Sequence, residues 1–242
     1  MIGKNVVPDL ESGKGAKMLY PSMQENPELR WSFIRKIYSI LTFQLFFTAI
    51  VASVVVFVKP ISQFLTTTTL GFALYIVVLI FPFLVLCPLY IYRDRHPVNY
   101  FLLIIFTLAI SLTVGLVCAF TQWKAILEAV ILTAVVVVSL TLYTFWAVRR
   151  GTDFNFLGPF LFSALIILIV FGLIQIFFPL GKLSQMIYGG LGAIIFSAYI
   201  IYDTNKLINK YSYDEYIWAA VSLYLDVINL FLSLLTLFRA SK

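Results

Sequence analysis

The sequence predicts an all-α integral membrane protein with seven transmembrane helices. Composition is the first observation, because 62% of the residues are hydrophobic and only 12% are charged, which is far from the balance of a soluble domain. Pattern is the second, because apolar runs long enough to cross a hydrocarbon core of about 30 Å follow one another along the chain. Continuity is the third, since the strands of a membrane barrel alternate apolar and polar residues over about 10 positions and these runs do not.

Seven apolar runs define the expected helices, and short polar or Gly/Pro-containing breaks separate them. The runs lie at 37–58, 70–92, 98–120, 125–148, 156–178, 183–203 and 217–238. We expect residues 1–36 to form a mobile cytoplasmic tail and residues 37–242 to form a single transmembrane domain. The tail has no long apolar stretch to act as a cleavable secretory signal, so the first helix is expected to direct membrane insertion.

Lysine and arginine residues favour short cytoplasmic loops. The amino-terminal tail holds six of them, and three loops on the same side hold two each, beginning at Arg93, Arg149 and Lys206. Seven full crossings then give twelve basic residues on this side and five on the other, which predicts a cytoplasmic amino terminus. A re-entrant last segment would give fourteen against three. We keep the full crossing because 217–238 is long and almost wholly apolar.

Ionisable side chains inside the apolar runs are the strongest functional signal, because a charge at mid-membrane costs about 2.5–3.5 kcal/mol on insertion scales. Three acids qualify, namely Glu128, Asp203 and Asp226. Glu128 lies about one turn inside its helix, where an ion pair with Lys124, four residues earlier, would explain it. Asp226 lies near the middle of the last run, and Asn229 shares its helical face.

Asp203 and Asp226 can face each other across an antiparallel pair of helices. Their carboxylates come level if the sixth helix ends near Lys210 and the seventh restarts near Ala219. The alternative is a surface cluster, because Lys206 and Lys210 share the face of Asp203 and could hold it there. Spacing alone leaves both arrangements open.

A buried aspartate pair would behave as a pH sensor. Two carboxylates in a low-dielectric core cannot both be ionised without a large electrostatic cost, so they titrate as one coupled unit. A protonated pair would hydrogen-bond and favour a packed, closed state. Ionised, the pair offers part of a calcium shell, whereas Ca²⁺ usually takes about six to eight oxygen ligands. We therefore expect weak, transient contact with calcium as a permeant ion, completed by water, Asn229 or backbone carbonyls, and no tightly bound cofactor.

The segment "GGLGA" (189–193) is rich in small residues. Small residues let helix backbones approach closely in membranes, so we expect this segment to pack against a neighbouring helix. A phosphate-binding loop is excluded because the Lys-Ser/Thr ending is absent.

Enzymatic functions are disfavoured. Serine hydrolases and metal hydrolases need histidine as base or ligand, and the chain has the single histidine His96 at a helix boundary. An intramembrane aspartyl protease would need Gly-x-Gly-Asp surroundings, which neither "YDT" nor "LDV" supplies. The net charge of +6 gathers at the expected cytoplasmic face, where anionic lipid headgroups account for it without nucleic acid.

Four segments carry a resemblance to a known family. They read "ENPELRWSFIRKIYSILTFQL" (25–45), "HPVNYFLL" (96–103), "AYIIYDTNKL" (198–207) and "LYLDVINLFLSLL" (223–235). These segments resemble the transmembrane Bax-inhibitor-motif family, specifically its LIFEGUARD branch as found in plants. The resemblance implies a seven-helix fold in endoplasmic reticulum or Golgi-type membranes, a pH-sensitive calcium leak and suppression of programmed cell death.

The resemblance also implies roles for particular residues. The two-aspartate sensor of the family corresponds to Asp203 in "YDT" and Asp226 in "YLDVINLF". In that family a basic residue on the second helix is thought to latch the pair shut, and Arg93 and Arg95 are the candidates by side and position. Asn229 and Glu128 are further supporting candidates.

Two other functions stay open on sequence alone. One is a non-conducting membrane interaction protein that regulates cell death by binding other membrane or cell-death proteins, and the other is a proton-coupled transporter. A leak passes calcium with the purified chain alone, an interaction protein does not, and a transporter shows saturable exchange. The lipid bilayer is a partner in all three.

Overall fold

The computed structural model describes residues 27–58, 60, 64, 68–178 and 180–242. Among these residues seven α-helices are long and apolar enough to cross a membrane, which confirms the predicted fold class. They are α1 (Pro27–Phe57), α3 (Thr69–Ile91), α4 (Val98–Ala119), α5 (Trp123–Arg149), α6 (Leu157–Phe177), α7 (Lys182–Asn209) and α8 (Tyr216–Ser241). A 3₁₀ turn, η1 (Tyr213–Glu215), precedes α8. Residues 1–26, most of the tail that we expect to be mobile, lie outside the described residues.

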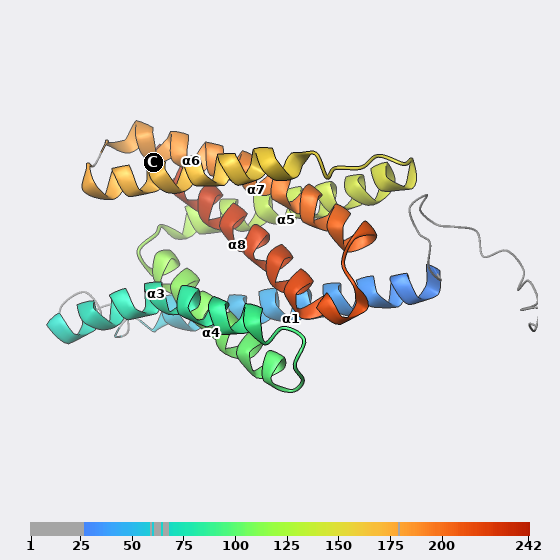
Figure 1. Cartoon of the computed structure of the whole chain (residues 1–242). Helices are drawn as coiled ribbons and strands as arrows, with labels where there is room; N and C mark the ends of the chain where they lie inside the picture. The colour runs from blue at the N-terminus through green and yellow to red at the C-terminus, as the bar shows by residue number, and fades with distance from the viewer. Residues whose placement is uncertain (1–26, 59, 61–63, 65–67, 179) are drawn as a thin grey trace, which may run out of the picture.

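Helix α8 lies in the middle of the bundle (Figure 1). It packs against α7, α5, α1 and α4, and most of its side chains are buried. Its 26 residues span about 39 Å at a rise of 1.5 Å per residue, which exceeds the thickness of a hydrocarbon core. The length of α8 therefore favours a full crossing over a re-entrant segment. By contrast, α6 packs mainly against α7 and exposes most of its apolar side chains.

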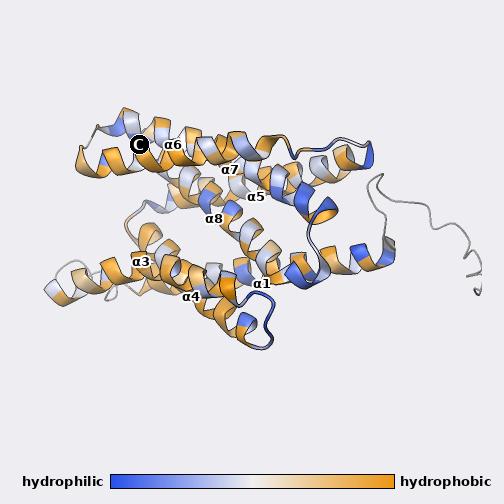
Figure 2. Cartoon of the chain, viewed as in Figure 1, coloured by the Kyte–Doolittle hydropathy of each residue, from blue (hydrophilic) through white to orange (hydrophobic). Residues whose placement is uncertain are grey.

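Basic loops gather toward one end of the bundle. The connections α3–α4, α5–α6 and α7–α8 lie toward the end where α1 begins, and the carboxyl terminus lies at the other end (Figure 1). Figure 2 shows hydrophilic residues in these connections and apolar residues along the helices between them. The predicted orientation of the protein in the membrane rests on this grouping of the basic loops. That this end faces the cytoplasm stays a prediction.

Helix α1 begins at Pro27, ten residues before the first predicted apolar run. The guanidinium of Arg30, which is 6% exposed, donates hydrogen bonds to the backbone oxygens of Ile208, at 2.9 Å, and of Tyr211. Hydropathy misses this start because the first turns of α1 pack against a polar turn rather than against lipid. The predicted tail, 1–36, is therefore too long.

Polar side chains join α8 to α1 and α4 inside the core. The hydroxyl of Tyr224 lies 2.7 Å from that of Thr48, which also accepts a hydrogen bond from Ser111 at 3.0 Å. Gln44 donates to Thr107 at 3.0 Å. All five side chains are buried, and a buried polar group is costly unless it is paired. The network therefore fixes the register of the three helices.

Helices α7 and α8 come into close contact at two glycines. A Cβ atom on Gly189 would lie 2.7 Å from both the backbone oxygen of Ser233 and the backbone nitrogen of Leu237. A Cβ atom on Gly192 would lie 2.5 Å from the side-chain oxygen of Ser233. The close packing predicted for 189–193 is confirmed, and α8 is the neighbouring helix.

Candidate functional site

The structure brings Asp203 of α7 and Asp226 of α8 together in the core. The two side chains are buried, at 7% and 6% exposure, and they are close enough to interact electrostatically with each other. Two carboxyl groups can share a hydrogen bond only when one of them holds a proton. Helix α7 continues six residues beyond Asp203, to Asn209, so both acids lie inside helices.

The turn between the two helices sets the register of the pair. Its capping box is formed by Glu215, which accepts hydrogen bonds from the backbone nitrogen and the hydroxyl of Ser212 at 3.1 and 3.0 Å. Arg30 of α1 donates hydrogen bonds to the backbone oxygens of Ile208, in the last turn of α7, and of Tyr211, in the turn that follows, and a helix end leaves such acceptors unpaired. Both ends of the turn are therefore fixed by hydrogen bonds.

Lys206 places a positive charge beside the pair. Its Nζ atom lies 3.1 Å from Oδ1 of Asp203 and faces the rings of Tyr202 and Tyr211 at 5.1 and 5.2 Å. Oδ2 of Asp226, in contrast, is buried and has no hydrogen-bond partner among the described residues. The facing pair and the lysine contact, which the sequence left as alternatives, occur together. The result is an asymmetric site in which one acid of the two has a cation.

The two candidate latch residues contact other groups. Arg93 lies 3.5 Å from Asp94 and 3.4 Å from Glu215, and Arg95 lies over the ring of Tyr92. In the described part of the chain no ion pair joins either arginine to the aspartates. Their latch role stays a prediction, and the cation that the structure places at the pair is a lysine of α7.

The other two supporting candidates, Asn229 and Glu128, form no hydrogen bond with the aspartate pair in the described part of the chain. Asn229 is half-buried one turn after Asp226, and across the described segments it makes no side-chain hydrogen bond to that acid. Glu128 forms an ion pair, as expected, but with Lys242 at 2.9 Å instead of Lys124. The expected partner is wrong because the end of α8 lies beside the start of α5, which the local spacing of charges cannot show.

A polar clamp beside the site was not predicted. Asp153, in the α5–α6 connection, accepts hydrogen bonds from the side-chain amides of Asn205 at 3.0 Å and Asn155 at 2.7 Å, and Asn209 donates to Asn205. Burial raises the pKa of Asp153, but these amide hydrogen bonds outweigh it and hold the pKa below its usual value. The one signal in the sequence is the spacing of Asn205 and Asn209, four residues apart on one helical face.

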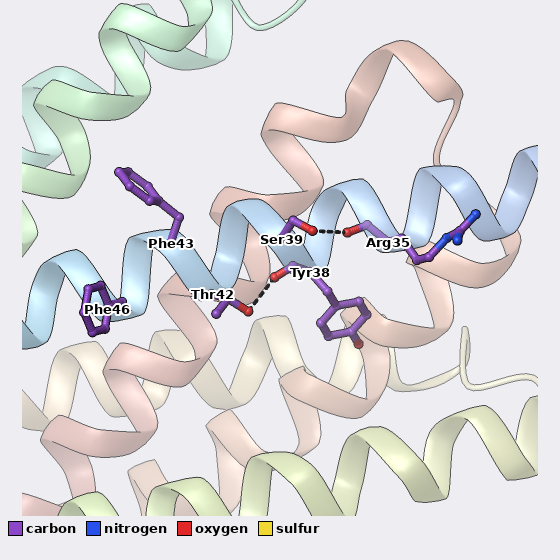
Figure 3. A pocket seen from close by; sticks show the side chains of 6 residues that line it. All are labelled: Arg35, Tyr38, Ser39, Thr42, Phe43 and Phe46. Atoms are coloured by element: carbon purple, nitrogen blue, oxygen red, sulfur yellow. Dashed lines mark hydrogen bonds between the residues drawn. The ribbon is translucent and has the colours of Figure 1, made fainter.

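One surface groove does not involve the aspartates. It has a volume of about 660 Å³ and runs along α1 (Figure 3), where it is lined by Arg35, Tyr38, Ser39, Thr42, Phe43 and Phe46. The hydroxyl groups of Ser39 and Thr42 donate to carbonyl oxygens one turn earlier in the same helix. This groove therefore offers no site for the chemistry of the buried pair.

Comparison with known proteins places the chain in a family. A family model described as "Inhibitor of apoptosis-promoting Bax1" matches residues 30–242. The chain is 68% identical over 232 residues to Protein LIFEGUARD 2 of Arabidopsis thaliana, with 96% of each chain covered. It is 66% identical over 236 residues to Protein LIFEGUARD 4 of the same plant, with 97% of this chain and 96% of the relative covered.

A more distant relative extends the comparison beyond plants. The chain is 37% identical over 215 residues to the Golgi anti-apoptotic protein of vaccinia virus strain Lister, with 88% of this chain and 87% of the relative covered. The family model and the plant relatives span nearly the whole described bundle, including the segments that hold both aspartates. The chain therefore belongs to the Bax inhibitor family, in its LIFEGUARD branch.

Proposed function

We propose that this protein is a pH-sensitive calcium leak channel of endoplasmic reticulum or Golgi-type membranes that suppresses programmed cell death. The observation that carries the proposal is the burial of Asp203 and Asp226 together in the core of a helical bundle, because acids inside membrane helices are costly and mark ion pathways. The names of the matching family and of the viral relative, which refer to apoptosis and to the Golgi, support the cellular part.

Gating follows from the number of protons at the pair. With one shared proton the two carboxyl groups hydrogen-bond, and α7 and α8 stay packed. Loss of that proton leaves two negative charges in low-dielectric surroundings, where they repel each other strongly, and Lys206 contacts only Asp203. The repulsion favours separation of the helices at this level and makes carboxylate oxygens available to Ca²⁺.

The same geometry suits a permeant ion rather than a stored one. Among the described residues, no cluster of three or more acidic, histidine or cysteine side chains could hold a metal ion. Two carboxylates fill only part of a calcium shell, so water must complete it and the ion can leave. The pair lies nearer the end with the basic loops, since Asp203 is about 9 Å of helix from the end of α7. With that end cytoplasmic, the pair responds to cytosolic pH.

Calcium efflux from liposomes that contain the purified full-length protein tests the proposal. We expect efflux above that of empty liposomes, rising with pH and with the calcium gradient. Saturable exchange of calcium for protons would instead indicate a transporter. A folded protein that passes no calcium would contradict the leak and indicate an interaction protein that acts through partner binding.

Replacing Lys206 by methionine is expected to shift the pH of half-maximal efflux upward by about one unit, because loss of a contacting cation makes ionisation of the pair harder. Lys210→Met is the matched control, since Lys210 is exposed at the end of the same helix. We expect its midpoint to stay close to that of the wild type. An equal shift in both variants, or none in Lys206→Met, would contradict a specific role for Lys206.

A further inference from the structure

A second groove lies between α6, α7 and α8, at the end of the bundle opposite the basic loops. It has a volume of about 480 Å³ and is lined by Ile169, Gly172, Leu173, Gln175, Ile176, Gln185, Tyr188, Thr236 and Arg239. Three helices contribute to it, unlike the groove along α1 (Figure 3). None of its nine described lining residues is acidic.

Two lining side chains have hydrogen-bond donors that other described residues do not use. Arg239 is exposed near the end of α8, and within the described ranges no acid pairs with it. The side-chain nitrogen of Gln175 is buried and lacks a hydrogen-bond partner in the same ranges. An unpaired buried amide is costly, and the guanidinium fork of arginine matches the oxygens of a phosphate group. Arg239 favours an anionic acceptor, and the amide of Gln175 needs an acceptor that the described residues do not supply.

The apolar wall of the groove comes from α6. Ile169, Leu173 and Ile176 follow one another at helical spacing and are at least half exposed. Ile169 lies about 10 Å deeper along the helix than Ile176, whereas Gln175 and Arg239 lie near the ends of their helices. Arg239 and Gln175 therefore lie at the outer end of the groove, beside Ile176, and Leu173 and Ile169 extend deeper.

We propose that this groove binds an anionic phospholipid, with its phosphate against Arg239 and Gln175 and an acyl chain along α6. Donors at the outer end and aliphatic side chains that extend deeper match the positions of phosphate and hydrocarbon in such a lipid. A second positive charge lies near the groove, since Lys182 is one turn before Gln185 at the same end of α7. Together with Arg239 it favours an anionic headgroup over a zwitterionic one. Basic sites between membrane helices bind acidic headgroups in this way.

Native mass spectrometry of the full-length protein in detergent, titrated with phosphatidylglycerol or with phosphatidylcholine of the same chains, tests the proposal. We expect wild-type protein to retain more phosphatidylglycerol, and Arg239→Gln to lower that binding by about tenfold, the effect of losing one charge-assisted hydrogen bond. Arg35→Gln, which removes an exposed arginine from the α1 groove, is the matched control. We expect it to bind phosphatidylglycerol as the wild type does.

Gln175→Leu supplies a second, independent variant. It removes the unpaired donor at similar volume, so we expect it to melt at the same or a higher temperature in lipid-free detergent and yet to bind less phosphatidylglycerol. Equal binding of the two lipids by wild type, or equal loss in Arg239→Gln and Arg35→Gln, would overturn the proposal. Complete displacement of the lipid by millimolar inorganic phosphate would also overturn it and assign the groove to free phosphate.

Discussion

Replacing Gly189 by alanine is expected to lower the free energy of unfolding by about 3 kcal/mol, at the upper end of the usual cost of overpacking. The added Cβ would lie 2.7 Å from backbone atoms of Ser233 and Leu237, and backbone atoms cannot rotate away as a side chain can. Helix α7 must therefore move away from α8. Because this contact and the aspartate pair lie along the same two helices, we also expect the variant to disturb the closed state.

Gly190→Ala is the matched control for that substitution. Gly190 is the next residue of α7, and a Cβ atom there would have no atom of a neighbouring helix within 4 Å. Alanine also favours a helix over glycine by about 1 kcal/mol, so we expect this variant to be as stable as wild type or more stable. Chemical unfolding in detergent micelles compares the two. Equal unfolding midpoints for both variants would show that the glycine contact does not determine helix packing.

Replacing Arg30 by methionine is expected to lower the free energy of unfolding by about 2–3 kcal/mol, because hydrogen bonds from a charged donor are lost and buried acceptors are left unpaired. The affected acceptors are the backbone oxygens of Ile208 and Tyr211. These oxygens lie at the turn that sets the register between α7 and α8. We therefore expect faster amide hydrogen exchange in that turn, with the rest of α7 protected.

Arg35→Met is the control for Arg30, since it removes an exposed arginine of the same helix. We expect this variant to unfold close to the wild-type midpoint and to keep the turn protected from exchange. Unchanged exchange in Arg30→Met would mean that the guanidinium contact does not stabilise the turn.

The transmembrane helices were predictable because each is a long apolar run, and a membrane requires such runs. The helix ends were predictable only where a helix stops at the last residue of its apolar run. Helix α7 continues past the end of its predicted run because Asn205 donates a hydrogen bond to Asp153 of the α5–α6 connection, and Asn209 donates one to Asn205. Helix α1 starts early for a similar reason, since Arg30 has buried acceptors.

The aspartate pair was one of two arrangements that the spacing allowed, because α7 and α8 are consecutive and antiparallel. The carboxylates come level if α7 ends near Lys210 and α8 begins near Ala219, and the observed ends, Asn209 and Tyr216, lie within one turn of these positions. Contacts between distant segments gave no such signal. The bond from Arg30 to Ile208 joins residues 178 positions apart, so only the packed bundle shows it.

Calcium efflux from liposomes between about pH 6 and 8, for wild type beside Asp203→Asn and Asp226→Asn, tests most directly whether the pair gates conduction. Asparagine keeps the shape but cannot ionise, so we predict that either substitution abolishes the pH dependence of efflux. Asp214→Asn, which changes an exposed acid of the neighbouring turn, should leave that dependence intact. An efflux that varies with pH in both variants as it does in wild type would contradict gating by Asp203 and Asp226.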